Sequence, residues 1–481
     1  MSVTDLYTVL PILVLIFGGV VLLLVDLVIP RKNKAYTAYL AIGVMLVALL
    51  AVPVGAGQTL SGFGGMIVAD SYSMFLDGLL LVIGIITVLL TLRYNVARGI
   101  MRGEFFPLTL FALSGMLLMG HSANLLIVFV AIELLSIPLY ILCGIARPNP
   151  KSEESALKYF LLGAFASGFL VYGIALIYGA TGTTNLAAIA TAVTSGAVSA
   201  NSGLLLVGTG LVLVGLGFKV AVAPFHMWTP DVYEGAPTTV TAFMATATKA
   251  AGFAAVVRVF LFGLAPIIDT WQPIVAVIAA FTMIIGNVVA LSQTNLKRML
   301  AYSSIAHAGY LLVGVAAGGQ NGTTGVLFYL AAYAVTSLAG FAVMTLMANE
   351  AGEDQRIEAY AGLFRRRPLM AIAMAISLFS LLGIPPTAGF VGKYFLFNAA
   401  VNSGLTWLAV IGMLTSVISA GYYLRVIVVM FMREPGTNEI EVSNAPRNAA
   451  MIFSVVAILV LGILPQIVMN LVGSNIVALA P

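Results

Sequence analysis

The residues best suited to chemistry in this sequence are charged side chains inside otherwise apolar segments. Three lysines, Lys219, Lys249 and Lys393, and one acid, Glu133, lie deep in such segments. A lysine at the centre of a bilayer costs roughly 2.5–3.5 kcal/mol on insertion scales, so packing alone does not explain these positions. A buried amine can exchange protons near neutral pH, and a nearby carboxylate favours its charged form. The four residues therefore predict a proton path in which Glu133 biases the first lysine.

Three further side chains are candidates for the same path. Lys158 lies one to two turns into a predicted segment, where it either assists the first pair or extends to the membrane surface. His226 and His307 lie near expected helix breaks, and histidine titrates close to neutral pH. A lone histidine is also a common structural residue, and His121, in a short turn, is predicted to be of that kind.

Proline breaks accompany the deep charges. A proline removes one helical hydrogen bond and frees the carbonyl four residues earlier. Pro138 frees the carbonyl directly after Glu133, and Pro224 frees the one directly after Lys219. In the second half, GIPPTAG from Gly383 interrupts the segment before the third lysine. Prolines and glycines are common in membrane helices in general, but free backbone at membrane depth must face protein or a water-filled cavity, so these pairings favour a functional site.

The elements that must position these residues are membrane helices. The chain has 481 residues, of which 61% are hydrophobic and 8% charged, which excludes a soluble globular protein and predicts an all-α polytopic membrane protein. Long continuous apolar segments favour helices over barrel strands. The first segment has no basic residues before it and no small-residue cleavage site, so we expect it to be a permanent span. The fourteen predicted spans are 6–29, 35–54, 71–92, 106–120, 123–146, 154–178, 203–223, 239–262, 273–291, 304–317, 324–347, 369–399, 405–432 and 449–472.

The basic residues sort by loop. Loops after even-numbered spans contain none, and the loop after span 7 instead carries the acids Asp231 and Glu234. Because cytoplasmic loops collect Lys and Arg, the pattern predicts that both termini lie on the periplasmic side of a bacterial inner membrane. The basic residues of the other odd-numbered loops are Arg31, Lys32, Lys34, Arg93, Arg98, Arg102, Arg147, Lys151, Lys297, Arg298, Arg356, Arg365, Arg366, Arg367 and Arg433, with Arg447 at the edge of span 14.

Four other charges lie in or near the ends of spans. Asp26, Arg258 and Arg425 are within reach of a span end, so we expect them to extend to the membrane surface or to pair locally. Asp77 lies inside span 3, and we predict that it pairs with a neighbouring helix or chain.

The spans predict two repeats. Spans 4 to 8 and 9 to 13 each contain five helices, with a broken helix fourth in each set, and an odd number of spans inverts the second copy in the membrane. The predicted domains are residues 1–105 (N-terminal helices), 106–265 (first antiporter-like repeat), 266–432 (inverted second repeat) and 433–481 (C-terminal helix).

Few residues suit a metal or a cofactor. One cysteine, Cys143, and three histidines exclude a disulfide framework and are too few for haem pairs, iron–sulfur clusters or a Cys/His zinc site. We therefore expect no metal and no cofactor to be bound by this chain. The net charge of +4 is small and sorted by membrane side, so it indicates topology and a lipid environment, with no nucleic-acid partner.

Several motifs carry a family resemblance. They are VAIELLSIPLY from Val130, SEESALKYFLLGAFASG from Ser152, GFKVAVAPFHMWTPDVYEGAPT from Gly217, LKRMLAYSSIAHAGY from Leu296 and GIPPTAGFVGKYF from Gly383. In order they cover spans 5 to 12, and they resemble the antiporter-like membrane subunits of respiratory complex I, NADH-quinone oxidoreductase. VYEGAPT is most similar to the subunit N branch. The third lysine differs from the glutamate of the M branch.

The resemblance implies roles for the deep charges. Glu133 and Lys219 would be an ion pair, Lys249 the central connecting residue and Lys393 the outward-side terminal residue. The chain would be a proton-translocating, non-redox subunit of a translocase, coupled to quinone reduction elsewhere. It would lie in the membrane arm between subunits K and M, in a complex that also contains J, A, H and L. NADH, FMN, iron–sulfur clusters and quinone would belong to other subunits, and the choice between protons and sodium stays open.

Three other functions compete with this one. The first is a subunit of a multi-subunit cation/proton antiporter or of a membrane-bound hydrogenase of the same ancestry. The second is an independent solute transporter, although the sequence offers single charges rather than a polar substrate pocket. The third is a structural scaffold, which the insertion cost of the deep lysines disfavours.

Overall fold

The computed structural model describes residues 2–30, 33–52, 59–348, 353–435 and 445–472. Within these ranges the chain is almost entirely helical, which confirms the all-α prediction. The sheet found there is a short antiparallel pair, β1 (Leu60–Gly62) and β2 (Ile67–Ala69). Arg31 and Lys32, which the sequence assigns to the first basic loop, lie outside the described residues.

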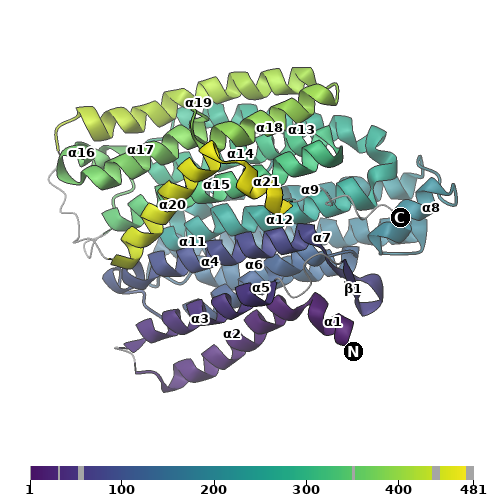
Figure 1. Cartoon of the computed structure of the whole chain (residues 1–481), viewed down its shortest axis with the longest axis horizontal. Helices are drawn as coiled ribbons and strands as arrows, with labels where there is room; N and C mark the ends of the chain where they lie inside the picture. Colours follow the sequence, from purple (N-terminus) through teal and green to yellow (C-terminus); the bar gives the residue numbers. More distant parts are fainter. Residues whose placement is uncertain (1, 31–32, 53–58, 349–352, 436–444, 473–481) are drawn as a thin grey trace.

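The helices extend from α2 and α3 at one edge of the molecule to α19 at the other, and α20 crosses the middle (Figure 1). The first half contains α1 (Val3–Thr8), α2 (Leu10–Val28), α3 (Ala35–Ala51), α4 (Ser71–Ala97), α5 (Phe105–His121), α6 (Leu125–Cys143), α7 (Pro150–Thr181), α8 (Leu186–Thr194), α9 (Gly203–Lys219) and α10 (Trp228–Gly235). The span after these is α11 (Thr238–Phe243), η4 (Met244–Thr248), α12 (Lys249–Val256) and η5 (Val257–Gly263). The remaining helices are α13 (Ile268–Leu291), α14 (Leu296–Ala317), α15 (Gly319–Met347), α16 (Leu363–Arg366), α17 (Pro368–Leu382), α18 (Ala388–Asn402), α19 (Thr406–Met432), α20 (Ala445–Ile463) and α21 (Gln466–Val472).

Ten of the described helices are long and apolar enough to cross a membrane, and α3, α5, α9 and α17 are shorter apolar helices. Each of the fourteen predicted spans overlaps one of these helices. That every one of them crosses the bilayer stays a prediction. The helices identify the chain as an integral membrane protein.

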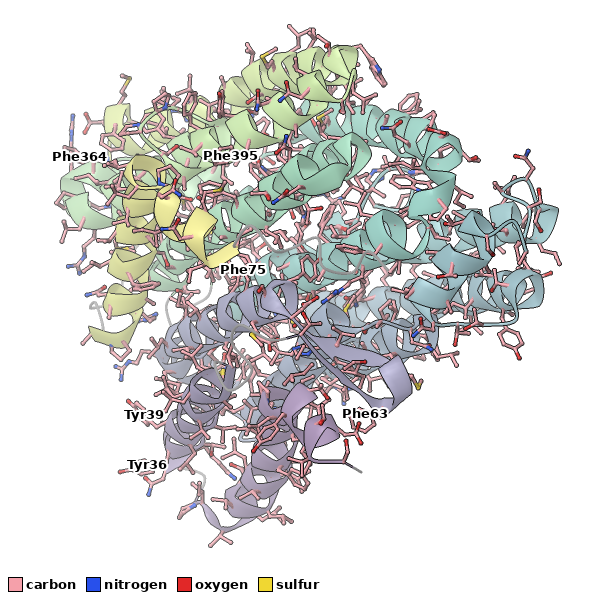
Figure 2. All side chains as sticks on the ribbon, turned by 45° about the vertical axis from the view of Figure 1, so that its right-hand side comes forward. Tyr36, Tyr39, Phe63, Phe75, Phe364 and Phe395 are labelled. Carbon is pink, nitrogen blue, oxygen red and sulfur yellow. The ribbon has the colours of Figure 1, made fainter. Side chains whose placement is uncertain are left out.

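Burial separates central from peripheral helices. The most apolar windows of α15 and of the α11–η5 span are 100% buried, whereas those of α2, α7 and α20 are 33%, 33% and 28% buried. Helices that are apolar all round and face outward need a lipid or protein neighbour. On α3, Tyr36 and Tyr39 point outward and are 61% and 54% exposed (Figure 2). Such tyrosines are typical of the membrane–water interface.

The loops gather at two opposite ends of the bundle. One cavity is lined by Arg98, Arg147, Gly235, Lys297 and Arg356, which follow spans 3, 5, 7, 9 and 11. We call this the basic end, and the cavity the basic-end cavity. A groove is lined by residues that follow spans 2, 4, 6, 8 and 10, including Ser61, Ala123, Leu186, Pro266 and Gly319. Successive loops therefore alternate between the two ends of the bundle, as the distribution of basic residues predicted. The orientation of the basic end toward the cytoplasm stays a prediction.

Three predictions about where helices begin or are interrupted are wrong. Helix α6 continues through Pro138, because one missing hydrogen bond does not end a helix that packs closely on its neighbour at Gly115. Helix α14 begins at Leu296, eight residues before the predicted span, because the Asn295 side chain caps it by accepting from the Arg298 amide. The last span is interrupted between α20 and α21 near Pro465, where a proline cannot continue the helix.

The charges near span ends pair locally, as expected. Arg258 forms two hydrogen bonds to Asp70, at 2.8 and 2.7 Å, and both side chains are buried. Asp77 of α4 lies 2.8 Å from His121 of the neighbouring α5, which confirms its pairing with another helix. Asp26 and Lys34 are 2.5 Å apart, and Arg425 donates to the backbone carbonyls of Leu291 and Gln293.

Candidate functional site

Lys219 is the last residue of α9, at the start of an irregular segment that runs to Met227 before α10 begins. The carbonyls of a helix C-terminus carry partial negative charge, so a lysine there is favoured. Lys219 is 5% exposed, and its Nζ donates to Ser136 Oγ at 2.8 Å and to Tyr159 Oη at 3.0 Å. The predicted break at Pro224 therefore exists, and it leaves Lys219 inside the bundle at the end of a half-helix.

Aromatic side chains enclose this amine. Lys219 Nζ lies 5.3 Å from the centre of the Tyr159 ring, and Trp228 stacks on the same tyrosine at 4.6 Å. The Trp228 indole donates to the Phe218 carbonyl at 3.0 Å, which ties α10 to the end of α9. Burial of the aromatic rings and the cation–π contact together help to hold a charge that is withdrawn from water.

Glu133 does not form a direct ion pair with Lys219 among the described residues. Its Oε1 accepts a hydrogen bond from Ser167 at 2.5 Å, and Glu133 is half-buried on α6. A small cavity of about 10 Å³ is lined by Ser136, Ser167 and Lys219, among others. That volume suits one water molecule, and the cavity is lined both by Lys219 and by Ser167, the hydrogen-bond partner of Glu133.

Lys249 is the first residue of α12 and directly follows the π-helical segment η4. It is 3% exposed, its Nζ donates to the backbone carbonyl of Ser304 on α14, and it lies 5.2 Å from the centre of the Tyr333 ring. π-Helical turns inside α-helices occur frequently at functional sites. The central lysine thus connects the first half of the chain to α14.

His307 lies in the middle of α14, so its expected place at the start of a span is wrong, because that helix begins earlier than predicted. Its Nδ1 is 2.5 Å from Tyr329 Oη, and its Nε2 is 3.2 Å from Tyr423 Oη. Ser304, the partner of Lys249, lies three positions before His307, so both residues lie on the same face of α14. His307 is therefore part of a buried polar cluster beside the central lysine.

Lys393 lies on α18 and reaches back across the break to the end of α17. Its Nζ donates to the carbonyls of Leu381 and Leu382, each at 2.9 Å, and to Ser416 Oγ at 2.6 Å. Charge-assisted hydrogen bonds are worth about 1.5–3 kcal/mol each, so three of them offset the roughly 2.5–3.5 kcal/mol insertion cost. The predicted break at Gly383 therefore supplies the carbonyls that hold this lysine.

Buried tyrosines and an asparagine lie close to Lys393 and His307, and no pattern in the sequence indicated them. The Tyr310 ring lies 4.7 Å from Lys393 Nζ, and Tyr310 Oη accepts from Asn287 at 3.2 Å. Asn287 also accepts from Tyr422 at 2.9 Å, while Tyr423 lies 2.5 Å from Ser303. All are buried, and tyrosine is common in apolar cores, so only the geometry reveals them.

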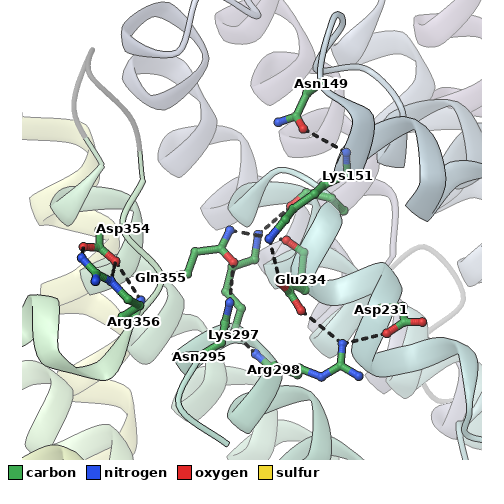
Figure 3. A network of polar contacts seen from close by, with 11 residues as sticks. Asn149, Lys151, Asp231, Glu234, Asn295, Lys297, Arg298, Asp354, Gln355 and Arg356 are labelled. Atoms are coloured by element: carbon green, nitrogen blue, oxygen red, sulfur yellow. Dashed lines mark hydrogen bonds and ion pairs between the residues drawn. The ribbon is translucent and has the colours of Figure 1, made fainter.

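Lys158 belongs to a group of ion pairs at the basic end. It pairs with Glu154 and Asp231, each at 2.7 Å, while Arg298 pairs with Asp231 at 2.7 Å and with Glu234 at 3.1 Å. Lys151 joins Glu234 at 3.0 Å. Figure 3 shows Arg298 reaching both acids of α10. We call Lys151, Lys158, Asp231, Glu234 and Arg298 the ion cluster.

The ion cluster explains the loop that lacks a basic residue. Partial burial acts to raise the pKa of Asp231, but hydrogen bonds from Lys158 and Arg298 outweigh it and hold that pKa below 3.8, its ordinary value. For Glu234, partial burial is likewise outweighed by Lys151 and Arg298, so its pKa lies below 4.5, its ordinary value. The acids of α10 thus receive basic residues from the flanking loops, and Lys158 has its partners at the surface rather than beside Lys219.

His226 is half-exposed in the segment between α9 and α10. Its Nδ1 makes no hydrogen bond among the described residues, and no contact joins it to the lysines there. Within the same ranges, no group of three His, Cys, Asp or Glu side chains is placed to hold a metal ion. Cys143 is buried, with its Sγ 3.4 Å from Met244 Sδ.

Comparisons with known proteins show the family of this chain. Residues 122–419 match the family described as NADH:quinone oxidoreductase/Mrp antiporter, TM. NADH-quinone oxidoreductase subunit N of Chloroflexus aggregans is 47% identical over 479 residues, covering 99% of this chain and 98% of that protein. The subunit N of Trichlorobacter lovleyi is 46% identical over 469 residues, covering 97% of this chain and 96% of the relative.

Solved structures share the fold. A chain of respiratory complex I from Thermus thermophilus with bound aureothin aligns with a TM-score of 0.82 and 37% identity, over 96% of this chain and 98% of that one. A chain of the Mrp complex from Dietzia sp. DQ12-45-1b aligns with a TM-score of 0.84 over 98% of this chain and 97% of its own length; at 24% identity it shows the fold alone. The chain therefore belongs to the family of antiporter-like membrane subunits of NADH-quinone oxidoreductase, in its subunit N branch.

Proposed function

We propose that this chain moves protons across a bacterial inner membrane through Glu133, Lys219, Lys249, His307 and Lys393. The observation that carries the proposal is that each of the three deep lysines donates to hydroxyl or carbonyl oxygens and to no carboxylate among the described residues. A carboxylate partner would fix each ammonium in its charged form, whereas these oxygens accept hydrogen bonds from a neutral amine as well. Each lysine can therefore take up and release a proton.

In the proposal, Glu133 controls the first proton transfer of the relay, at Lys219. Ser167, which donates to the Glu133 carboxylate, lines the same water-sized cavity as Lys219. In the proposal Glu133 leaves Ser167 and turns its carboxylate toward the amine. A carboxylate at that position favours the charged lysine, and its return to Ser167 favours release toward Lys249. Lys158 and His226 lie outside this line, and in the proposal Lys158 positions α10 through the ion cluster.

The coupling partner lies in other chains. The relatives named above are subunits of NADH-quinone oxidoreductase, so we propose that this chain is a non-redox translocase subunit driven by quinone reduction elsewhere. NADH, FMN, iron–sulfur clusters and quinone would bind to other subunits. Its membrane neighbours would be subunits K and M, within an arm that also holds J, A, H and L, and both of its termini would face the periplasm.

Protons are favoured over sodium as the transported ion. Sodium and other hard cations need several oxygen ligands, usually carboxylates or carbonyls. The proposed relay instead contains the amines of Lys219, Lys249 and Lys393, and an ammonium group repels a metal cation. The cation/proton antiporter alternative shares the fold but gains no ligand set from the described residues.

The test is proton pumping by the assembled complex in sealed vesicles. Lys219→Ala and Glu133→Ala should each lower the protons pumped per NADH oxidised, because the relay loses a station. Electron transfer from NADH to a hydrophilic acceptor should stay near wild type, since that chemistry uses other chains. Arg365→Ala, which removes a 56% exposed arginine outside the ion cluster, is the matched control. Unchanged pumping per electron in both relay variants would refute the assignment.

A further inference from the structure

The basic-end cavity is large and carries an excess of positive charge. Its volume is about 610 Å³, within the range of roughly 300–1,000 Å³ that is usual for ligand pockets. Five cations and two acids, Glu353 and Asp354, line it, so positive charges exceed negative ones by three. A concave surface lined mainly by one sign of charge attracts ions of the other sign. The cations are Arg98, Arg147, Lys151, Lys297 and Arg356.

Two of these lysines occupy the same position at the start of a helix. Asn149 caps α7 and Asn295 caps α14, and Lys151 and Lys297 each follow their asparagine by two positions. Both pairs lie around the same group of polar contacts (Figure 3). The first turn of a helix carries partial positive charge, so it disfavours a lysine and favours an anion. Both helix starts therefore favour a negatively charged partner at this cavity.

Lys151 has such a partner, and Lys297 has none. Lys151 is 68% exposed, and its Nζ lies 3.0 Å from Glu234 Oε1. Lys297 is 1% exposed, and its Nζ donates to the Ala236 carbonyl at 2.6 Å. Within the described ranges Lys297 forms no ion pair, since the Glu353 carboxylate accepts from Tyr94 and Thr238 instead.

The position of Lys297 also differs from those of Lys219 and Lys393. These two deep lysines lie at helix C-termini, where carbonyls carry partial negative charge and favour an ammonium. Lys297 is buried at a helix start, with one neutral acceptor for its three N–H groups. A buried charge without a counter-charge is strongly unfavourable, so this ammonium calls for an anion.

Two arginines of the same lining are available to that anion. Arg98 is half-buried at the end of α4, and Arg147 is exposed after α6. In the part of the chain that the structure describes, neither guanidinium donates a hydrogen bond or forms an ion pair. A guanidinium can donate two parallel hydrogen bonds to a phosphate. Because a phosphate group carries several acceptor oxygens that point in different directions, it suits three separate cations better than a carboxylate does.

We propose that the basic-end cavity binds a phosphate group, held by Lys297, Arg98 and Arg147 beside the start of α14. The phosphate is that of an anionic phospholipid headgroup or a free phosphate ion, because both present the same oxygens to these cations. The bound anion offsets the excess positive charge, and it ties together the loops that follow spans 3, 5 and 9. The site is separate from the proposed relay and does not depend on it.

Two measurements on the full-length chain in detergent distinguish the sources of the phosphate. Equilibrium dialysis against radiolabelled inorganic phosphate tests the free ion. Native mass spectrometry with phosphatidylglycerol, with phosphatidylcholine for comparison, tests the anionic headgroup. We expect one of these two anions to bind. Binding of phosphatidylglycerol without free phosphate would assign the site to a lipid, and the reverse result would assign it to the free ion.

The decisive variant is Arg98→Gln, because it breaks no side-chain contact among the described residues. It should weaken binding of the anion at least about tenfold, since a hydrogen bond to a charged group contributes at least that much. Lys297→Gln should weaken binding as well. Arg433→Gln is the matched control and should bind as wild type, because it removes an exposed arginine of the loop after span 13 that does not line the cavity.

Three results would overturn the proposal. They are wild-type chain that binds neither anion, equal binding by Arg98→Gln and Arg433→Gln, and stronger binding of a polyglutamate peptide than of either anion in competition. The last result would make the cavity a site for an acidic protein segment. If Lys297→Gln fails to fold, as shown by its melting temperature, Arg147→Gln takes its place with the same expected loss.

Discussion

The chemistry of single residues centres on three amines with similar surroundings. Lys219, Lys249 and Lys393 each donate to hydroxyl or carbonyl oxygens and lie within 5.3 Å of a tyrosine ring centre. The ring offers its negative face to an ammonium and an apolar surface to a neutral amine. The ring can therefore contact the amine in either protonation state, which supports the proposed relay.

Lys393→Arg should abolish coupled turnover although the charge is retained. A guanidinium does not deprotonate in proteins, and its planar fork does not fit three oxygens arranged around one nitrogen. The measurement is NADH-driven quinone reduction together with pumping in vesicles. Lys151→Arg, at the surface, should behave as wild type. Normal coupled turnover in Lys393→Arg would show that this residue need not release its proton.

At the scale of helices, each of the two broken spans places a lysine near the C-terminus of a half-helix, but in a different way. Lys219 ends its own half-helix, α9, whereas Lys393 reaches from α18 back to the last carbonyls of α17. The second arrangement needs the two half-helices to approach closely. Gly389 provides for that, because a Cβ there would lie 1.8 Å from the Ser380 carbonyl oxygen.

Gly389→Ala should therefore separate α17 from α18 and weaken the cradle of Lys393. Overpacking of this kind costs typically about 1–3 kcal/mol, so we expect a lower melting temperature of the detergent-solubilised chain. Gly168→Ala is the control, since nothing lies within 4 Å of a Cβ at that position. Equal melting temperatures for the two variants would contradict the close approach.

The ion cluster predicts an acid-sensitive position of α10. The lowered pKa values of Asp231 and Glu234 mean that their stabilisation is present above their ordinary values of 3.8 and 4.5 and is lost as pH falls through the lower values of the folded protein. Because the pairs are partly exposed, removal of Arg298 should cost only about 0.2–1 kcal/mol.

This can be measured by hydrogen exchange of the amides of Trp228–Gly235, corrected for intrinsic rates. Arg298→Ala should show faster exchange than wild type at pH 7, and the difference should shrink in acid. Arg356→Ala, which removes a pair formed with Asp354 outside the ion cluster, is the control. Identical exchange in Arg298→Ala and wild type at pH 7 would show that the ion cluster does not hold α10.

At the scale of the whole molecule, the central residues of the proposed relay, Lys249 and His307, lie on two of the most buried spans. The windows of α14 and α15 are 94% and 100% buried, while that of α19 is 39% buried. We expect the free energy of unfolding to depend more on side chains of the buried helices than on those of the peripheral helices. Leu338→Ala on α15, where the side chain is 0% exposed, should cost about 2–5 kcal/mol. Leu414→Ala on α19, where it is 62% exposed, should melt near wild type in the isolated chain, and equal losses would contradict a central core.

The sequence predicted the helices and the deep charges because both depend on insertion cost, which composition reveals directly. It also predicted the breaks at Pro224 and Gly383. It misplaced the start of α14, because Lys297 and Arg298 resemble a loop, although Lys297 is buried and donates to the Ala236 carbonyl at 2.6 Å. The tyrosine partners could not be predicted, since contacts between distant spans leave no local pattern.

The π-helical segment η4, directly before Lys249, has a mechanical consequence. A π turn holds one more residue than an α turn, so its conversion to α-helix rotates the following residue by about 100° and shifts it by about 1.5 Å. Lys249 would then turn away from the Ser304 carbonyl without any helix unfolding. Such a conversion would turn the amine by about a quarter turn relative to the preceding part of the span.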